Sequence, residues 1–503
     1  MALHASVWQA TAEMPVCPPL QEDLHVQVCV VGAGIAGLST AYLLAKAGKS
    51  VAVIDDGPIA GGMTQMTSAH LTHAIDDRYY ELERLHGRIG ARLAAESHTA
   101  AIERIEAIVR EENIGCDFAR VDGYLFLAEG DRVETLEKEL DAAQRAGLSR
   151  VRRVERAPAF DSGPCLCFPN QGQFHPLKYL AGLTQALHRH GGRVFTGTHV
   201  DAIEGGTPAL VHTGNRLVSA DAVIVATNTP VNDRVAIHTK QAPYMTYVIG
   251  VRVPDGAVPA ILAWDTGDPY HYVRVADDIL IVGGEDHKSG QADDTDQRHA
   301  RLEAWTRARF PMAGEVAYRW GGLVMETVDY LSFTGRNPGD KDNVFIHTGD
   351  SGMGLTHGTI AGMLLTDLVL GRQNPWAALY DPGRKTVGAA RDYASENLNV
   401  ARQYADWLTA GEVKSADEIA PGSGAVMRRG LQKIAVYRDP QGALHERSAA
   451  CPHLGCVVHW NRSEQTWDCP CHGSRFDCRG KVLNGPANRD LASAERAHNK
   501  RAA

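Results

Sequence analysis

Two short segments near the C-terminus, each containing cysteine and histidine, limit what this chain of 503 residues can fold into. The first is CPHLGC (residues 451–456) and the second is CPCHGS (residues 469–474). Fifteen residues separate His453 from Cys469, and five of the ten cysteines fall between Cys451 and Cys478. Thiols and imidazoles at this density predict a metal site that draws its ligands from two loops.

The two segments resemble the ligand loops of Rieske [2Fe-2S] domains, in which two cysteine thiolates hold one iron and two histidines hold the other. Carried over by position, the resemblance implies that Cys451 and Cys469 bind one iron. It likewise implies that His453 and His472 bind the second iron. We therefore expect a [2Fe-2S] cluster of the Rieske type.

A structural zinc site is the alternative, because two cysteines and two histidines also supply tetrahedral ligation. The resemblance to Rieske domains accounts for more of the sequence. Cys456 and Cys471 take the places of the two cysteines that form a disulfide between the loops in high-potential members, and Ser474 matches a serine that bonds a bridging sulfide. Residues 485–487 (GPA) stand where the family has its proline loop.

A glycine-rich turn near the N-terminus predicts a dinucleotide site. Residues 26–31 read as a buried strand, residues 35–47 as a helix, and residues 51–54 as a second strand. Between the first strand and the helix lies GAGIAG (residues 32–37), which fits the G-x-G-x-x-G pattern that brings a pyrophosphate to a helix N-terminus. Asp55, 23 residues after Gly32, is placed to bind the ribose hydroxyls of the adenosine half.

Residues 20–385 resemble the superfamily of D-amino-acid oxidase and glycine oxidase, which selects FAD over NAD. The motifs that carry the resemblance are GGMT (61–64), TSAHLT (67–72), VIVATN (223–228) and TGDSGMGLT (348–356). The resemblance implies that the early motifs lie along the flavin and that the last brings backbone donors and a helix N-terminus toward the isoalloxazine. The fused architecture as a whole resembles bacterial FAD-dependent oxidoreductases with a C-terminal Rieske domain.

The residues assigned to FAD by these motifs are Gly32, Gly34, Ile35, Ala36, Gly37, Asp55, Asp56, Gly62, Met63, Thr64, Thr67, Ser68, Ala69, His70, Val200, Ala226, Thr227, Gly349, Asp350, Gly352, Met353, Gly354, Leu355 and Thr356.

The chain is expected to form an α/β FAD-binding Rossmann-like domain with an inserted mixed-sheet substrate domain, as in D-amino-acid oxidase, plus a small all-β Rieske domain. Further strands are predicted at 222–226, 279–282 and 344–347, with a helix at 177–190. A polar helical run near 384–408 and the sequence PGSG (421–424) indicate a linker. The expected domains are residues 1–385, a helical linker at 386–424, and residues 425–503.

Charge and hydropathy narrow the range of partners. A formal charge of -9 and a pI near 6.2 argue against a nucleic-acid binder. We expect no membrane span, because there is no run of about 18 apolar residues. Residues 1–23 lack the basic start and apolar stretch of a signal peptide, so a cytoplasmic location is expected. Nothing in the sequence indicates an oligomeric state.

The function expected from these features is oxidation of an amine or amino acid at the carbon next to nitrogen, with electrons passing from FAD to the cluster and on to an unidentified acceptor. In amino-acid oxidases of this superfamily the last flavin motif continues into a lysine that holds the substrate carboxylate, and here Thr356 and His357 stand in that place. These two residues, with Tyr272 and Arg274, are the weak catalytic candidates. His70 is a further candidate, for covalent attachment to the flavin.

Two other functions are compatible with the same cofactors. The chain could be an electron-transfer component, with the flavin and cluster relaying electrons to or from a partner protein. It could also be a redox sensor in which the cluster or the Cys456 and Cys471 pair changes a binding surface.

Overall fold

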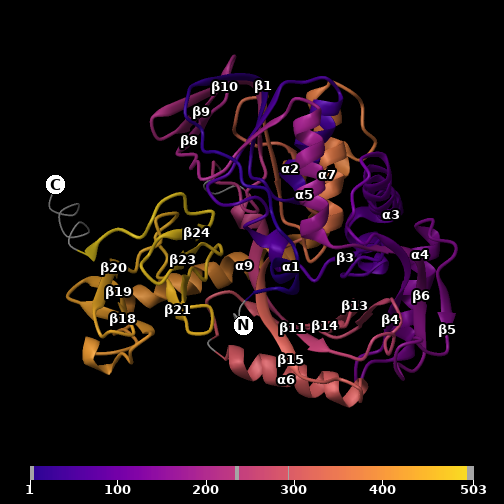
Figure 1. Cartoon of the computed structure of the whole chain (residues 1–503). Helices are drawn as coiled ribbons and strands as arrows, with labels where there is room; N and C mark the ends of the chain where they lie inside the picture. The colour runs from indigo at the N-terminus through magenta and orange to yellow at the C-terminus, as the bar shows by residue number, and fades with distance from the viewer. Residues whose placement is uncertain (1–4, 233–236, 293, 495–503) are drawn as a thin grey trace.

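The structure is a computed structural model that describes residues 5–232, 237–292 and 294–494. It contains two large sheets, covered by helices, and a small C-terminal β domain that lies beside both (Figure 1). Within the described residues, no helix is both long enough and apolar enough to cross a bilayer.

The first sheet has the strand order β16-β17-β10-β1-β2-β7. Strands β17, β10, β1, β2 and β7 run parallel, and β1, β2 and β17 are apolar and buried along most of their length, as strands covered on both faces are. The strands of this sheet are β1 (Leu24–Val31), β2 (Val51–Ile54), β7 (Arg193–Phe195), β8 (Ala202–Glu204), β9 (Ala209–Thr213), β10 (Arg216–Val225), β16 (Phe333–Arg336) and β17 (Val344–Thr348).

Three helices lie side by side against this sheet: α2 (Ile35–Lys46), α5 (Pro176–Arg189) and α7 (Gly354–Val369) (Figure 1). Glycines bring α7 close to α2, because a Cβ added at Gly358 would lie 2.7 Å from the side chain of Ile35. A Cβ at Gly362 would lie 2.8 Å from that of Ser39. The packing brings the N-termini of α2 and α7 to the same end of the sheet, where both line one cavity.

The second sheet has the strand order β15-β11-β14-β13-β12-β4-β6-β3, with β5 at its edge beside β6. Helix α6 packs on β11 and β14, and α3 and α4 pack against each other. The elements of this part are β3 (His70–Leu71), α3 (Tyr79–Glu111), β4 (Ala119–Phe126), α4 (Val133–Arg145), β5 (Arg152–Val154), β6 (Cys165–Gln173), β11 (Gln241–Arg252), β12 (Leu262–Asp265), β13 (Tyr272–Ala276), β14 (Ile279–Lys288), α6 (Thr295–Arg309) and β15 (Val316–Thr327).

The C-terminal domain consists of two small antiparallel sheets. Trp467 and Phe476 are fully buried in its core. Its strands are β18 (Ser423–Arg429), β19 (Gln432–Arg438), β20 (Leu444–Ser448), β21 (His459–Asn461), β22 (Thr466–Asp468), β23 (Arg475–Asp477) and β24 (Val482–Asn484).

Short elements complete the chain and connect its parts. Helix α9 lies between the second sheet and the C-terminal domain, within the segment expected to be a linker (Figure 1). The short elements are α1 (Val7–Thr11), η1 (Met63–Met66), η2 (His238–Lys240), α8 (Ala377–Tyr380), η3 (Val387–Ala389), α9 (Ala390–Gln403), η4 (Tyr404–Leu408) and η5 (Ala416–Glu418).

The strand, helix and strand predicted over residues 26–54 are confirmed as β1, α2 and β2. Helix α1 was not predicted. It is held in place by Trp8, which is 1% exposed and donates a hydrogen bond from Nε1 to the carbonyl of Thr67 at 2.7 Å.

Candidate functional site

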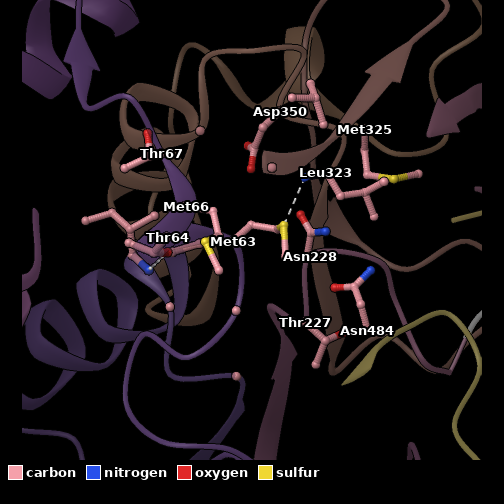
Figure 2. A pocket seen from close by; sticks show the side chains of 18 of the residues that line it. Met63, Thr64, Met66, Thr67, Thr227, Asn228, Leu323, Met325, Asp350 and Asn484 are labelled. Carbon is pink, nitrogen blue, oxygen red and sulfur yellow. Dashed lines mark hydrogen bonds between the residues drawn. The ribbon is translucent and has the colours of Figure 1, made fainter. Parts of the chain in front are cut away.

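A cavity of about 320 Å³ lies where the first sheet, the second sheet and the C-terminal domain meet. Figure 2 shows part of its lining: Met63 and Thr64 come from the segment after β2, and Leu323 and Met325 come from β15. Asn484, at the end of β24, projects toward Thr227 and Asn228 (Figure 2). The cavity is therefore closed on one side by the C-terminal domain.

The glycine-rich turn forms one end of this cavity. Gly32 has a φ of +108°, and a Cβ there would lie 2.3 Å from the carbonyl oxygen of Ala226. A Cβ at Gly37 would lie 1.9 Å from the carbonyl oxygen of Gly32, so the helix can pack this closely only with glycine. The backbone here is held against the neighbouring strand in the way that approach of a pyrophosphate requires.

Asp55 joins the turn to the end of β2. Its carboxylate accepts a hydrogen bond from the amide of Ala33 at 2.6 Å and another from the amide of Gly57 at 2.8 Å. Burial raises the pKa of Asp55 to about 6, and these two hydrogen bonds oppose the rise. The carboxylate lines the cavity at the place expected for a ribose, so the residues at this end fit the adenosine half of FAD.

Most of the residues assigned to FAD line this cavity. Those that line it are Gly32, Gly34, Ile35, Ala36, Asp55, Asp56, Gly62, Met63, Thr64, Thr67, Ser68, His70, Val200, Ala226, Thr227, Asp350, Gly352, Met353, Gly354 and Leu355.

Four assigned residues, Gly37, Ala69, Gly349 and Thr356, lie behind the lining. Gly37 serves helix packing, and Gly349 has a φ of +77° with no room for a Cβ beside Thr327. The carbonyl of Ala69 accepts a hydrogen bond from Arg274, and Thr356 donates one to the carbonyl of Thr72. These residues shape the site from outside.

The catalytic candidates also divide into residues that line the cavity and residues that lie behind the lining. Tyr272 lines the cavity, and its hydroxyl is 2.8 Å from the Thr246 hydroxyl. Thr356, His357 and Arg274 do not line it. The His357 ring hydrogen-bonds the carbonyl of Asp350, and the Arg274 guanidinium is buried against backbone carbonyls, so neither faces a substrate.

His70 lines the cavity, and both of its ring nitrogens have partners. Nδ1 lies 3.1 Å from the Ser68 hydroxyl, and Nε2 lies 3.2 Å from the carbonyl oxygen of Val273. Burial, with a smaller contribution from Arg274, lowers the pKa of His70 to about 3, so the ring is neutral.

The other end of the cavity contains side chains that the sequence did not assign to it. They project from the second sheet and the segment that precedes α3. These residues are Asp76, Thr246, Trp264, Asp286 and Glu326. Each lies in a different stretch of sequence, and no motif connects them.

The two cysteine and histidine loops come together in the C-terminal domain. Cys451 and Cys469 are 2% and 1% exposed and are not in a disulfide. The His453 and His472 rings lie 4.9 Å apart. Cys456 and Cys471, whose Cα atoms are 6.4 Å apart, form a disulfide that ties one loop to the other.

These donors fit a Rieske cluster. The sulfurs of Cys456, Cys469 and Cys471 lie within 4.8 Å of one another, but the disulfide leaves only Cys469 of these three able to bind as a thiolate. With Cys451 it supplies two thiolates, and the two histidines supply the imidazoles. Burial, followed by the neighbouring His453 and His238, lowers the pKa of His472 to about 3, which keeps the ring neutral as a ligand must be.

The linker segment supports the first cluster loop. The Tyr404 hydroxyl donates a hydrogen bond to the carbonyl of Leu454 at 2.8 Å, and Trp407 Nε1 donates one to the carbonyl of Gly455 at 3.0 Å. The segment expected to be a linker therefore also positions the loop that contains Cys451 and His453.

The cluster loops pack directly against the flavin side of the molecule. His238, which precedes β11, places its ring 4.7 Å from the His453 ring and 5.8 Å from the His472 ring. A Cβ at Gly473 would lie 2.6 Å from Pro243 and 3.3 Å from Leu323, which itself lines the cavity. One layer of side chains thus separates the cavity from the loop that contains His472.

Comparison with known proteins identifies two families in the chain. Residues 27–368 match the family model described as FAD dependent oxidoreductase, and residues 409–495 match that of the Rieske [2Fe-2S] domain. The Rieske match decides against the zinc alternative. It begins within the range 386–424 that was expected to be a linker.

Individual relatives agree with this division. A Bacillus subtilis protein named as a Rieske 2Fe-2S iron-sulfur protein, YhfW, is 31% identical over 96% of this chain and 96% of its own length. Gamma-glutamylputrescine oxidoreductase of Escherichia coli is 28% identical over 74% of this chain and 90% of its own length. The crystal structure of glycine oxidase from Geobacillus kaustophilus shares the fold, with a TM-score of 0.61 at 17% identity over 72% of this chain and 99% of that one.

Proposed function

The chain belongs to the family of FAD dependent oxidoreductases and contains a Rieske [2Fe-2S] domain, and from this premise we propose that it is an amine or amino-acid dehydrogenase that uses both centres. In this proposal the substrate is oxidised at the carbon next to nitrogen, and the electrons leave through the cluster to an external acceptor. The relationship to gamma-glutamylputrescine oxidoreductase supports an amine substrate.

One observation carries the electron-transfer part of the proposal: the cavity and the cluster loops share a wall. Asn484 lines the cavity, and its amide donates to the carbonyl of Gly473, next to the ligand His472, at 3.4 Å. On the other side Leu323 lines the cavity and packs against the same glycine. This shared wall supports transfer of single electrons between FAD bound in the cavity and a cluster bound by the loops.

Bound FAD supplies a two-electron acceptor for hydride, whereas the cluster carries one electron at a time. The residues of the chain provide the surroundings for both. Asp55 and the turn at Gly32 would hold the nucleotide end of FAD, and the buried disulfide and Trp407 keep the first cluster loop in place. Packing of His238 against both histidines keeps the two domains in contact at the cluster.

The proposal is tested by anaerobic titration of the holoenzyme with a panel of amines and amino acids. Flavin absorbance and the electron paramagnetic resonance signal of the reduced cluster report the two centres separately. We expect loss of flavin absorbance followed by the cluster signal. In the Cys451→Ser variant, which lacks a cluster ligand, the flavin should still bleach and no cluster signal should appear.

Reduction of both centres by NAD(P)H or a protein donor, and by no member of the panel, would contradict the proposal and favour an electron relay.

A further inference from the structure

Three carboxylates, those of Asp76, Asp286 and Glu326, line the part of the cavity formed by the second sheet and the segment before α3. Among the residues that line the cavity in the described part of the chain, none is a lysine or arginine. A substrate carboxylate would therefore meet negative charge without a cationic partner. A protonated amine would meet the opposite charge it needs.

The nearest buried guanidiniums are already engaged elsewhere. Arg78 donates to the carbonyl of Asp265 at 2.9 Å and to that of Asp76, and it is not part of the lining. Arg274 donates to the carbonyl of Ala69 at 2.6 Å. His70, which also lines the cavity, is neutral because burial lowers its pKa to about 3.

Asp286 supplies an independent sign that a donor belongs in the cavity. One of its carboxylate oxygens is shielded from solvent and has no hydrogen-bond partner among the described residues. A buried acceptor left in this state is costly, and a bound N–H group would satisfy it.

The carboxylate of Asp76 is held by a neighbour that contains an aromatic ring. Tyr270 donates from its hydroxyl to Asp76 at 2.7 Å, and its ring is 5.5 Å from that of Tyr272. Trp264 completes the aromatic part of this lining. Aromatic faces beside carboxylates form the combination that binds ammonium groups, since both attract a cation.

Burial, together with repulsion between the carboxylates, raises the pKa values of the acidic groups in this part of the cavity. Burial raises the pKa of Asp286 to about 7, with a further contribution from Asp76 and Asp268. Burial also raises the pKa of Glu326 well above its usual range, with contributions from Asp77, Asp76 and Asp286. A positively charged ligand would stabilise the ionised carboxylates and so offset both the cost of burying their charge and the repulsion between them.

Resting on the function proposed above, we propose that the substrate is an aliphatic diamine or polyamine with no carboxylate on the carbon that is oxidised. A bound cation would favour the ionised forms of these carboxylates, and three carboxylates can pair with more than one ammonium group, which favours a second cationic nitrogen. One ammonium group first gives a proton to a carboxylate. The neutral amine then loses a hydride from the adjacent carbon to the bound FAD, and the resulting iminium is hydrolysed by one water to an aldehyde and ammonium.

The test uses the holoenzyme and three matched probes: 1,4-diaminobutane, 4-aminobutanoate and ornithine. Ornithine is 1,4-diaminobutane with a carboxylate added to one terminal carbon, and 4-aminobutanoate has a carboxylate in place of one aminomethyl group. Binding is read from the change in the flavin spectrum and oxidation from anaerobic bleaching. We expect the diamine to bind at least tenfold more tightly than either carboxylate-containing probe and to be the probe that bleaches the flavin fastest.

Two isosteric variants locate the effect. Asp286→Asn and Glu326→Gln should each weaken diamine binding at least tenfold while FAD content stays unchanged, because both residues lie away from the nucleotide end. Asp255→Asn, at an exposed position in the same part of the fold, is the matched control and should bind as the unaltered protein does.

The possible failures are distinct. If ornithine or 4-aminobutanoate binds as tightly as the diamine, the inference about substrate class is overturned even when the cluster is reduced. If the diamine bleaches the flavin and the cluster stays oxidised, the result supports the proposed substrate class and contradicts the proposed electron transfer to the cluster.

Discussion

The two ends of the cavity are built in different ways. At the nucleotide end, Gly32 and Asp55 belong to one contiguous strand, helix and strand unit, and the contacts are made largely by backbone atoms. At the substrate end, Asp76, Asp286 and Glu326 come from separate stretches of sequence, and the contacts are made by side chains. The comparison teaches that the cofactor end tolerates little change, whereas the substrate end can be altered one side chain at a time.

The largest effect is expected at the nucleotide end. Gly32→Ala places a Cβ 2.3 Å from the carbonyl oxygen of Ala226 at a φ of +108°. The displaced turn should cost about 3 kcal/mol or more and leave the purified protein without FAD. Flavin absorbance per chain measures the outcome. Gly115→Ala, where a Cβ meets nothing within 4 Å, is the control that should retain FAD. Normal FAD content in Gly32→Ala would contradict the statement that the nucleotide end tolerates little change.

The cluster loops resemble the nucleotide end, since they too are contiguous and held by backbone contacts. Ser474 tests whether one side chain matters there: it is fully buried, and its hydroxyl accepts a hydrogen bond from the amide of Ala487 at 2.9 Å. In a Rieske cluster bound by these loops, the Ser474 hydroxyl would donate to a bridging sulfide, and Ser474→Ala would remove that donor. A hydrogen bond to a charged group contributes about 1.5 kcal/mol, so the one-electron potential should fall by about 60 mV.

A redox titration followed by electron paramagnetic resonance measures this shift. An unchanged potential would show that the Ser474 hydroxyl serves packing alone.

At the substrate end, Tyr270→Phe removes the hydroxyl that donates to Asp76 at 2.7 Å. Losing this hydrogen bond should weaken amine binding by about 1 kcal/mol, or roughly fivefold, and leave FAD content unchanged. Binding is followed through the flavin spectrum. Loss of FAD in this variant would mean that the two ends are not independent, contrary to the comparison.

The smallest effect is expected where the C-terminal domain touches the nucleotide end. His199 lies 3.3 Å from the Asp56 carboxylate and 3.3 Å from the carbonyl of Asn488. The hydrogen bond with Asp56 raises the pKa of His199 above 6.5. The stabilisation is therefore fully present below pH 6.5 and is lost as the pH rises through the higher value of the folded protein.

Because His199 is partly exposed, this stabilisation should be below about 1 kcal/mol. Thermal unfolding of the protein and of His199→Gln across this pH range measures it. The difference between the two melting temperatures should shrink as the pH rises, and a constant difference would assign the effect of His199 to packing.

Much of the molecule could be predicted from sequence because the informative contacts are local. Residues 26–55 form one unit whose strands are adjacent, and each cluster loop holds its own ligands within a few residues. The substrate end could not be predicted, because Asp76, in the segment before α3, and Asp286, on β14, are brought together only by the tertiary fold. The positions of Thr356 and Arg274 behind the lining also depend on how α7 and β13 pack.

The central claim is that electrons pass from flavin to cluster within one chain. Stopped-flow mixing of anaerobic holoenzyme with a reducing amine, repeated at several protein concentrations, tests it most directly. We predict that the cluster is reduced after the flavin with a rate constant that does not depend on protein concentration. An equimolar mixture of Cys451→Ser, which retains FAD, and Gly32→Ala, which retains the cluster, should lack this phase. A rate that scales with protein concentration, or an equal rate in the mixture, would contradict the account.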